Sequence, residues 1–240
     1  MEFGIGTDGA RCSIFNADSE QIYRCPCCGE ELLQKRGKIV IWHFAHKSLD
    51  KCVGYYDNKS PWHRSMQDLF PERNREIFNG DYGKHFFDVL TDNGTIVEFQ
   101  NSPMTIDEFQ SRTDAYFSFS IKHRSRNPIW VFNYVSRNFY VYFSGEEGRF
   151  VKVRWYRPSK IFGDYAHKLS KCELWFRIAP LRYRPEEYTV FDGEQDVVAL
   201  DYSVGKREPR YLKVLNIYNG KCVYGDEFSE DEFKKYIQGV

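Results

Sequence analysis

The sequence has no excess of charge of either sign. Its 240 residues include 34 Lys and Arg and 34 Asp and Glu, so the formal net charge at pH 7 is zero. Proteins that coat nucleic acid without specificity are usually strongly basic, so the bulk charge does not favour that class. The balance is still compatible with an enzyme that confines its positive charge to one groove.

Long apolar runs are missing as well. No segment approaches the roughly 20 apolar residues of a membrane span, and no N-terminal apolar stretch follows a basic start. Internal repeats and low-complexity tracts are also absent. We therefore expect a cytoplasmic protein with no membrane partner.

Aromatic residues, in contrast, are abundant at 18% of the chain. Aromatic side chains fill protein cores and β-sheets, and they also form platforms on which bases stack. Core filling is the more frequent use, and composition alone leaves both open.

The seven cysteines are distributed unevenly. Five of them precede residue 53, and the total is odd. A disulfide framework usually has an even number of cysteines in a secreted chain, so this distribution indicates metal binding instead.

The N-terminal zone has the ligand types of a zinc site. Two cysteines form a Cys-x-x-Cys motif followed by Gly29, which permits a tight turn, and a His-x-x-His motif and a further cysteine come later. Five residues compete for the four positions of a tetrahedral site: Cys25, Cys28, His43, His46 and Cys52. Cys27 is expected to point away from such a site. A closed site with four ligands would be structural, and it would hold together a zone too small for its own core.

Three zones follow one another along the chain, and we predict domains at residues 1–57, 58–145 and 146–240. The first is expected to contain short strands and turns, and the last a mixture of strands and a terminal helix. The middle zone is predicted to be a compact α/β core. Its expected elements are a helix at Ser60–Leu69, strands at Lys84–Leu90 and Thr95–Gln100, a helix from Met104 to about Phe117, and strands at Ile129–Val135 and Asn138–Phe143.

Two acidic residues flank a predicted hairpin in this core. Asn93-Gly94 is a strong turn signal, with Asp88 on the strand before it and Glu98 on the strand after it. Carboxylates on adjacent strands can together hold a hard cation such as Mg²⁺. Gln100 shares a face with Glu98, because side chains alternate along a strand. On spacing alone, ordinary solvent-facing residues remain the more frequent explanation.

Several short motifs then occur in a characteristic order. They are Cys25-Pro-x-Cys28-Gly, His43-Phe-Ala-His46, Ser60-x-Trp-His63, Phe87-Asp-Val-Leu90, Val97-Glu-Phe-Gln-Asn-Ser102, Gln110-x-Arg-Thr-x-Ala-Tyr116 and Ile129-Trp-Val. Together they span roughly residues 20–135, and the series resembles the CoiA-like, or competence-protein-like, family.

The resemblance implies a fold and an activity. That family is similar to the restriction-endonuclease-like, or PD-(D/E)XK, nuclease superfamily, which implies an α-β-β-β-α-β core between the zinc module and a small α+β C-terminal extension. It implies a Mg²⁺- or Mn²⁺-dependent deoxyribonuclease acting in competence, recombination, phage or defence contexts, with DNA and possible recombination or defence proteins as partners. The residues that it assigns to the active site are Asp88, Glu98, Gln100, His63, His85, Gln110 and Arg112.

One departure from the family pattern bears on catalysis. Family members usually carry a glutamate just before the equivalent of His63, where it assists metal binding, but Lys59 and Pro61 stand in this region here. The consequence is weaker metal affinity, substitution by another acid such as Asp57, or loss of catalysis.

Three hypotheses follow for function. The first is a metal-dependent nuclease acting on DNA, in which Asp88 and Glu98 bind the metal. The second is a DNA-binding protein that has lost this chemistry, and a lysine blocking the acidic pair would favour it. The third is an interaction module within a larger DNA-processing assembly.

Overall fold

The computed structural model describes residues 1–48, 52, 59–81, 85–102, 104–133, 139–143, 150–155, 169–178, 209–218 and 222–239. The chain divides into two compact units, Met1–Ile96 and Val97–Val240. The predicted domain boundaries after residues 57 and 145 fall outside the described residues. Within the described part of the chain, no helix is long and apolar enough to cross a membrane.

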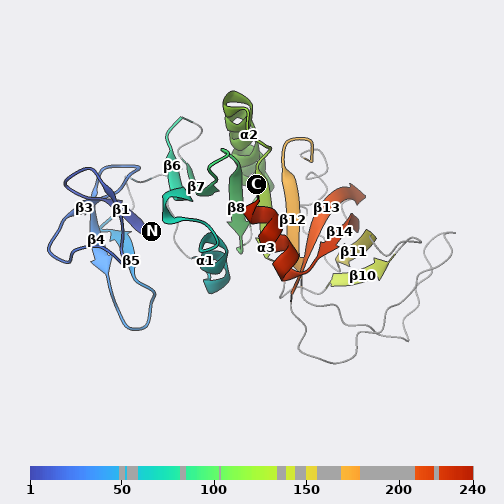
Figure 1. Ribbon diagram of the computed structural model, residues 1–240, viewed down its shortest axis with the longest axis horizontal. Coiled ribbons are helices and arrows are strands. Elements are labelled where there is room, and N and C mark those ends of the chain that lie inside the picture. Colours follow the sequence, from blue (N-terminus) through green and yellow to red (C-terminus); the bar gives the residue numbers. More distant parts are fainter. Residues whose placement is uncertain are drawn as a thin grey trace. The chain divides into compact units, whose positions relative to one another are not determined.

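The first unit begins with a sheet of five short antiparallel strands, in the order β2-β1-β3-β4-β5 (Figure 1). The strands are β1 (Phe3–Ile5), β2 (Arg11–Ser13), β3 (Tyr23–Arg24), β4 (Glu31–Lys35) and β5 (His43–His46). Their small core includes the buried side chains of Ile14, Tyr23, Leu32 and Phe44. This confirms the predicted zone of short strands and turns.

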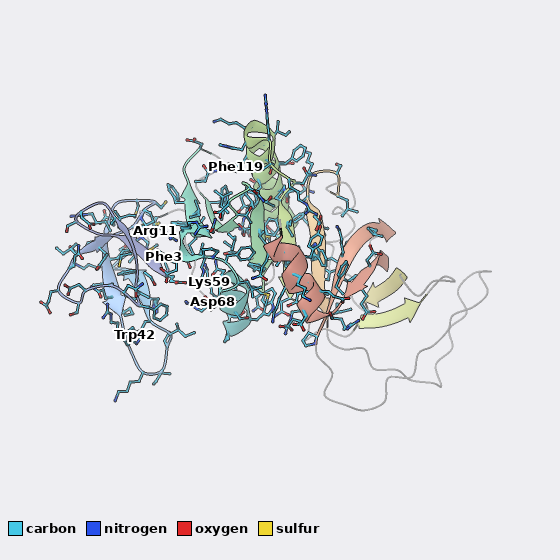
Figure 2. All side chains as sticks on the ribbon, viewed as in Figure 1. Phe3, Arg11, Trp42, Lys59, Asp68 and Phe119 are labelled. Atoms are coloured by element: carbon cyan, nitrogen blue, oxygen red, sulfur yellow. The ribbon has the colours of Figure 1, made fainter. Side chains whose placement is uncertain are left out.

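Phe3 of β1 and Arg11 of β2 form an aromatic and cationic pair. The guanidinium of Arg11 lies 3.4 Å from the centre of the Phe3 ring, and Figure 2 shows the two side by side. A guanidinium on an aromatic face is attracted by the ring quadrupole while its nitrogens stay available for hydrogen bonds. Arg11 uses them on the next part of the same unit, as described below.

A short helix follows in the same unit. Helix α1 (Pro61–Gln67) begins where the sequence predicts, because Ser60 accepts a hydrogen bond from the His63 backbone N–H at 3.2 Å and Pro61 suits the first helical position. After the 3-10 turn η1 (Glu72–Asn74), strand β6 (Arg75–Asn79) pairs antiparallel with β7 (His85–Leu90).

The Asn93-Gly94 turn at the end of β7 is also confirmed. The backbone N–H of Thr91 donates to the Thr95 carbonyl at 3.0 Å, and Gly94 donates back to Thr91 at 2.9 Å. Gly94 has a φ of 77°, which a residue without a Cβ adopts at little cost. A tight turn of this kind fixes which residues of the two flanking strands are opposed.

The second unit is built on a mixed sheet in the order β8-β9-β12-β13-β14-β11-β10. Its strands are β8 (Ile96–Gln100), β9 (Ile129–Asn133), β10 (Phe139–Phe143), β11 (Phe150–Trp155), β12 (Glu173–Ile178), β13 (Arg210–Tyr218) and β14 (Cys222–Phe228). β9 is parallel to both β8 and β12, and the other pairs in this series are antiparallel. The predicted continuous apolar run is therefore a central strand, with Ile129, Trp130 and Val131 fully buried.

Two helices belong to this unit. Helix α2 (Ile106–His123) is capped by Thr105, which accepts from Glu108 N–H at 3.2 Å, and it ends at Arg124 in the left-handed region. It is longer at its C-terminal end than predicted. Helix α3 (Glu230–Gln238) has a complete capping box between Ser229 and Glu232, and it is the predicted terminal helix.

The predicted mixed α/β class is confirmed. The elements from α1 to β9 follow one another along the chain as helix, three strands, helix and strand. Membership of the restriction-endonuclease-like superfamily stays a prediction.

Candidate functional site

Three cysteines and one histidine of the first unit converge on one point. One ligand atom from each of Cys25, Cys28, His46 and Cys52 lies within 4.8 Å of the other three. The Cys25 and Cys52 Sγ atoms are 3.9 Å apart, and Cys28 Sγ is 3.4 Å from Nε2 of His46. These are four of the five predicted candidates.

The Cys25–Gly29 segment is folded as a metal-binding turn. Gly29 N–H donates to the Cys25 carbonyl at 2.9 Å, and Cys25 N–H donates to the Glu30 carbonyl at 2.8 Å. Gly29 has a φ of 73°, so it supplies the left-handed residue that the sequence predicts there. Cys27 N–H donates to Cys25 Sγ at 3.3 Å, an orientation in which the backbone supports the sulfur.

The spacing fits zinc. In a tetrahedral zinc site, two sulfur ligands lie about 3.8 Å apart, and a sulfur and an imidazole nitrogen about 3.6 Å apart. Both measured distances agree with these values. Burial raises the pKa of the Cys25 thiol to about 12, so a thiolate at this position needs a cation beside it. The cluster can hold a zinc ion, with all four positions filled by protein in the manner of a structural site.

His43 is the candidate outside the cluster. Its Nδ1 lies 2.8 Å from the Ile41 carbonyl. Both histidines lie on β5, where His43 is opposite Lys35 and His46 is opposite Leu32. Residues three apart on a strand point to opposite faces of the sheet. Because His-x-x-His lies on a strand here, only one of its two histidines can face the cysteines.

A second group of polar side chains surrounds Asp88 of β7, and all of its members belong to the first unit. His63 Nε2 lies 2.9 Å from Asp88 Oδ1. Gln67 Nε2 donates to the Asp88 carbonyl at 3.0 Å and to Oδ1 at 3.3 Å. Lys59 Nζ lies 3.6 Å from the same Oδ1. The structure thus brings together His63 and Asp88, two of the predicted site residues.

Glu76 is a member of this group that sequence reasoning missed. Its Oε1 lies 2.6 Å from Lys59 Nζ, and only 4% of the residue is exposed. Its backbone φ is 47°, in the left-handed region where a side chain other than glycine is strained. Neither a metal-ligand spacing nor a turn motif marks this position, so its role could be found only from the fold.

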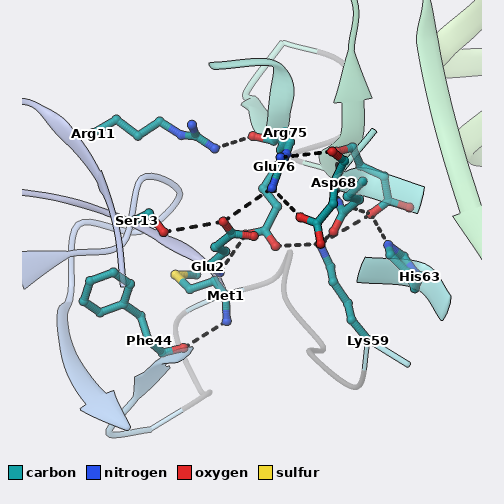
Figure 3. A network of polar contacts seen from close by, with 12 residues as sticks. Met1, Glu2, Arg11, Ser13, Phe44, Lys59, His63, Asp68, Arg75 and Glu76 are labelled. Atoms are coloured by element: carbon teal, nitrogen blue, oxygen red, sulfur yellow. Dashed lines mark hydrogen bonds and ion pairs between the residues drawn. The ribbon is translucent and has the colours of Figure 1, made fainter. Parts of the chain in front are cut away.

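The Glu76 carboxylate connects the polar side chains around Asp88 to the N-terminal sheet (Figure 3). Glu2 N–H donates to Glu76 Oε2 at 2.9 Å, and Glu2 Oε1 lies 3.8 Å from Arg75 NH1. Arg11 donates to the Glu72 carbonyl at 2.8 Å and also to the Arg75 carbonyl. Burial, followed by the charge of Glu76, raises the pKa of Glu2.

Glu98 of β8 lies in the second unit and is almost completely buried, with 2% exposed. It forms a close ion pair with Arg112 of α2, whose Nε also donates to the Tyr116 hydroxyl at 2.9 Å. The Arg112 guanidinium lies 4.9 Å from the centre of the Trp130 ring. Burial raises the pKa of Tyr116 well above its usual value, so this hydroxyl stays neutral.

The other predicted residues occupy more peripheral positions. Gln100 is half-buried at the end of β8, and its Nε2 donates to the Ser102 carbonyl at 2.7 Å. His85 is half-buried at the start of β7. Gln110 lies two residues before Arg112 on α2, so the two side chains point in directions about 200° apart around the helix axis. Asp57, the acid considered as a substitute, lies outside the described residues.

The comparison with known proteins concerns the segment that contains the Cys25, Cys28, His46 and Cys52 cluster. The family model described as competence protein CoiA, N-terminal domain, matches residues 10–54. No curated protein and no solved structure matches the chain. The matched segment contains every member of the Cys25, Cys28, His46 and Cys52 cluster. Residues 10–54 are thus similar to the N-terminal domain of the competence protein CoiA, which supports the predicted CoiA-like family for this chain.

Proposed function

We propose that this chain is a competence-related protein that hydrolyses DNA with the help of a divalent metal ion. The observation that carries the proposal is the burial of two carboxylates, Asp88 and Glu98, on the strands that flank one tight turn. A buried carboxylate is costly to retain unless it is paired, hydrogen-bonded or bound to a metal. The family match at residues 10–54 supports the competence context.

The turn also favours cooperation between the two carboxylates. Its hydrogen bond from Thr91 to Thr95 places these two residues opposite each other. The sequence predicts a hairpin over Asn93-Gly94 with Asp88 before it and Glu98 after it, and the proposal adopts that prediction. Carboxylates on adjacent strands can together bind one hard cation.

The remaining groups have distinct roles in the proposal. A Mg²⁺ or Mn²⁺ ion held by Asp88 and Glu98 would activate water and neutralise phosphate charge. His63, in contact with Asp88, is suited to proton transfer, with His85 as the alternative. Gln100 orients the attacking water. Arg112 would stabilise phosphate charge.

Glu76 extends this proposal. The family pattern places a metal-assisting acid near His63, where this chain has Lys59. The Lys59 ammonium contacts both Glu76 and Asp88, so these two carboxylates are close neighbours. We propose that Glu76 supplies, from a strand, the acid that is missing from the helix.

Lys59 also favours a second candidate function. Its ammonium is shared by Asp88 and Glu76, and Arg112 lies against Glu98, so each buried acid already contacts a protein cation. These contacts supply positive charge to the acids without a metal ion. The second candidate is a DNA-binding protein of the same fold that has lost phosphodiester hydrolysis.

Cleavage assays separate the two candidates. We would incubate the purified protein with labelled single- and double-stranded DNA and either Mg²⁺ or Mn²⁺, and compare it with Asp88→Asn, Glu98→Gln and Glu76→Gln. Asp92→Asn, an exposed acid beyond β7, is the matched control. Metal-dependent cleavage that is lost in the first two variants and retained in the control supports the nuclease.

An inactive wild-type protein would reject the nuclease proposal. The Lys59→Met variant then tests the reason for the inactivity, because it removes the cation that competes with a metal ion at Asp88. Cleavage that appears only in this variant would show a site blocked by Lys59. DNA binding without cleavage in every variant would leave the second candidate.

A further inference from the structure

The loop between β4 and β5 exposes a series of apolar side chains in the first unit. Ile39 is 98% exposed, and Val40, Ile41 and Trp42 follow it on the surface. This loop, residues 36–42, extends away from its sheet (Figure 1). Phe15, which is 53% exposed, lies beside it on the β2–β3 connection. A contiguous exposed apolar surface of this kind usually marks a binding site.

The charge of the hairpin is strongly one-sided in a chain whose net charge is zero. Between Leu32 and Lys47 there is no Asp or Glu, whereas Lys35, Arg36 and Lys38 precede the apolar tip. Lys35 and Lys38 are both exposed. The positive charge of the hairpin favours binding of an anionic partner.

The aromatic rings beside the loop have an ordered arrangement. The rings of Phe15 and Trp42 are nearly parallel, at 17° with centroids 6.3 Å apart. The Arg36 guanidinium lies 5.2 Å from the centre of the Trp42 ring and donates to the Ile14 carbonyl at 3.3 Å. Arg36 therefore ties the Phe15 segment to the hairpin. Two exposed rings held in this way provide a preformed surface for a flat ligand.

The Cys25, Cys28, His46 and Cys52 cluster lies at the other end of the hairpin. His46 lies on β5, in register with Leu32 of β4, and Cys28 lies just before β4. An ion bound to both residues would fix the spacing of the strands that carry the loop. The exposed rings and lysines would then project from a rigid base, which lowers the entropy lost on binding.

We propose that this hairpin binds single-stranded DNA. Bases of a single strand stack on Phe15 and Trp42, and Lys35 and Lys38 contact the phosphates. Stacking on aromatic rings combined with a basic track is the general chemistry of single-strand binding, whereas the bases of a duplex are already stacked on one another. The inference rests on the proposed action on DNA for the choice of strand, but it does not require cleavage.

An anionic membrane is the main competing partner, and the two use different parts of the hairpin. A bilayer would take Ile39 and Val40 into its acyl region. A nucleic acid strand would use the rings of Phe15 and Trp42. Substitutions in these two pairs therefore separate the alternatives.

The test is fluorescence anisotropy of a labelled oligothymidine strand, with zinc-loaded full-length protein in an Asp88→Asn background so that cleavage plays no part. We expect Phe15→Ala with Trp42→Ala, and separately Lys35→Glu with Lys38→Glu, each to weaken binding about tenfold or more. Lys235→Glu with Leu215→Ser, exposed positions in the other unit, should bind like the parent. Zinc content and thermal unfolding establish that each variant is folded.

Equal binding by the parent and both hairpin variants would overturn the proposal, even if the wild-type protein cleaves DNA. Binding to vesicles containing phosphatidylglycerol that is lost in Ile39→Ser with Val40→Ser, without strand binding, would also overturn it and identify a membrane site. Strand binding that depends on the rings and lysines would support it, even if no variant cleaves DNA. The result is thus independent of the nuclease test.

Discussion

The ammonium of Lys59 lies 2.6 Å from Oε1 of Glu76, and both side chains are almost completely removed from solvent. The pair joins the segment before α1 to strand β6, two parts of the chain separated by 17 residues. Removing one partner of a buried ion pair leaves the other charge without compensation, which costs far more than the pair itself contributes.

We expect Lys59→Met to lower the free energy of unfolding by about 3–5 kcal/mol. The double variant Lys59→Met with Glu76→Gln should recover much of the loss, because Glu76 then carries no uncompensated charge and Asp88 keeps its contacts with His63 and Gln67. Urea denaturation without divalent ions measures both. Lys47→Met is the control: Lys47 pairs with Glu31 at 3.1 Å on the surface, and its loss should cost less than about 1 kcal/mol. Equal effects at the two lysines would contradict the buried pair.

Arg112 and Glu98 allow the same comparison in the second unit. Arg112→Met should destabilise the protein by about 3–5 kcal/mol, because Glu98 is buried beneath it. Arg73→Met, which removes an exposed pair with Asp92, should have little effect. Added Mn²⁺ should raise the melting temperature of Arg112→Met more than that of the parent, because a cation can replace the lost guanidinium. No such difference would argue against a metal site at Glu98.

The histidines of β5 provide a matched pair for the metal cluster. His46→Ala should lose bound zinc and unfold at a lower temperature, because it removes one of four ligands. His43→Ala should retain one zinc ion per chain, since its ring contacts the Ile41 carbonyl instead. Elemental analysis of purified protein and thermal unfolding with a chelator would check both variants. Zinc loss in His43→Ala would contradict the assigned ligand set.

Glu2 should make stability depend on pH. Its pKa in the folded protein is raised above the ordinary value of a glutamate, mainly by burial and then by the charge of Glu76. The folded state therefore holds this proton more tightly than the unfolded state. The resulting stabilisation is complete below the unfolded pKa and is lost as the pH rises through the folded pKa.

Glu2→Gln removes that titration. We expect the free energy of unfolding of this variant, relative to the parent, to increase as the pH rises from about 4 to 7. Urea denaturation at several pH values measures the difference. Glu31→Gln, an exposed position on β4, should give a much flatter difference over the same range. A difference that falls with pH would contradict the sign.

Local signals carried most of the correct sequence predictions. Ser60-Pro61 located the start of α1, Asn93-Gly94 located the turn, and the spacing of Cys25 and Cys28 located half of the metal cluster. Each of these features depends on residues close together in sequence. The apolar run from Ile129 correctly indicated a buried strand for the same reason.

Other parts of the site depend on tertiary contacts that no local pattern encodes. Glu76 reaches Lys59 and the Glu2 backbone from a strained position on β6, and nothing in its neighbourhood predicts either contact. The Lys59 ammonium reaches Asp88 because α1 and β7 pack together around Gln67. The sequence showed that an acid was missing near His63, but only the fold shows which acid lies there.

The contacts between the N-terminal sheet and Glu72–Glu76 have a consequence for protein synthesis. The ribosome adds residues from the N-terminus, so Cys25, Cys28, His46 and Cys52 emerge before the acceptors for Glu2 and Arg11 exist. The nascent sheet can therefore fold around a metal ion at this cluster before the rest of the unit is made. In cells starved of zinc during translation, Glu76 should emerge before the N-terminal sheet that carries Glu2 has folded. We expect such chains to be degraded early by proteases.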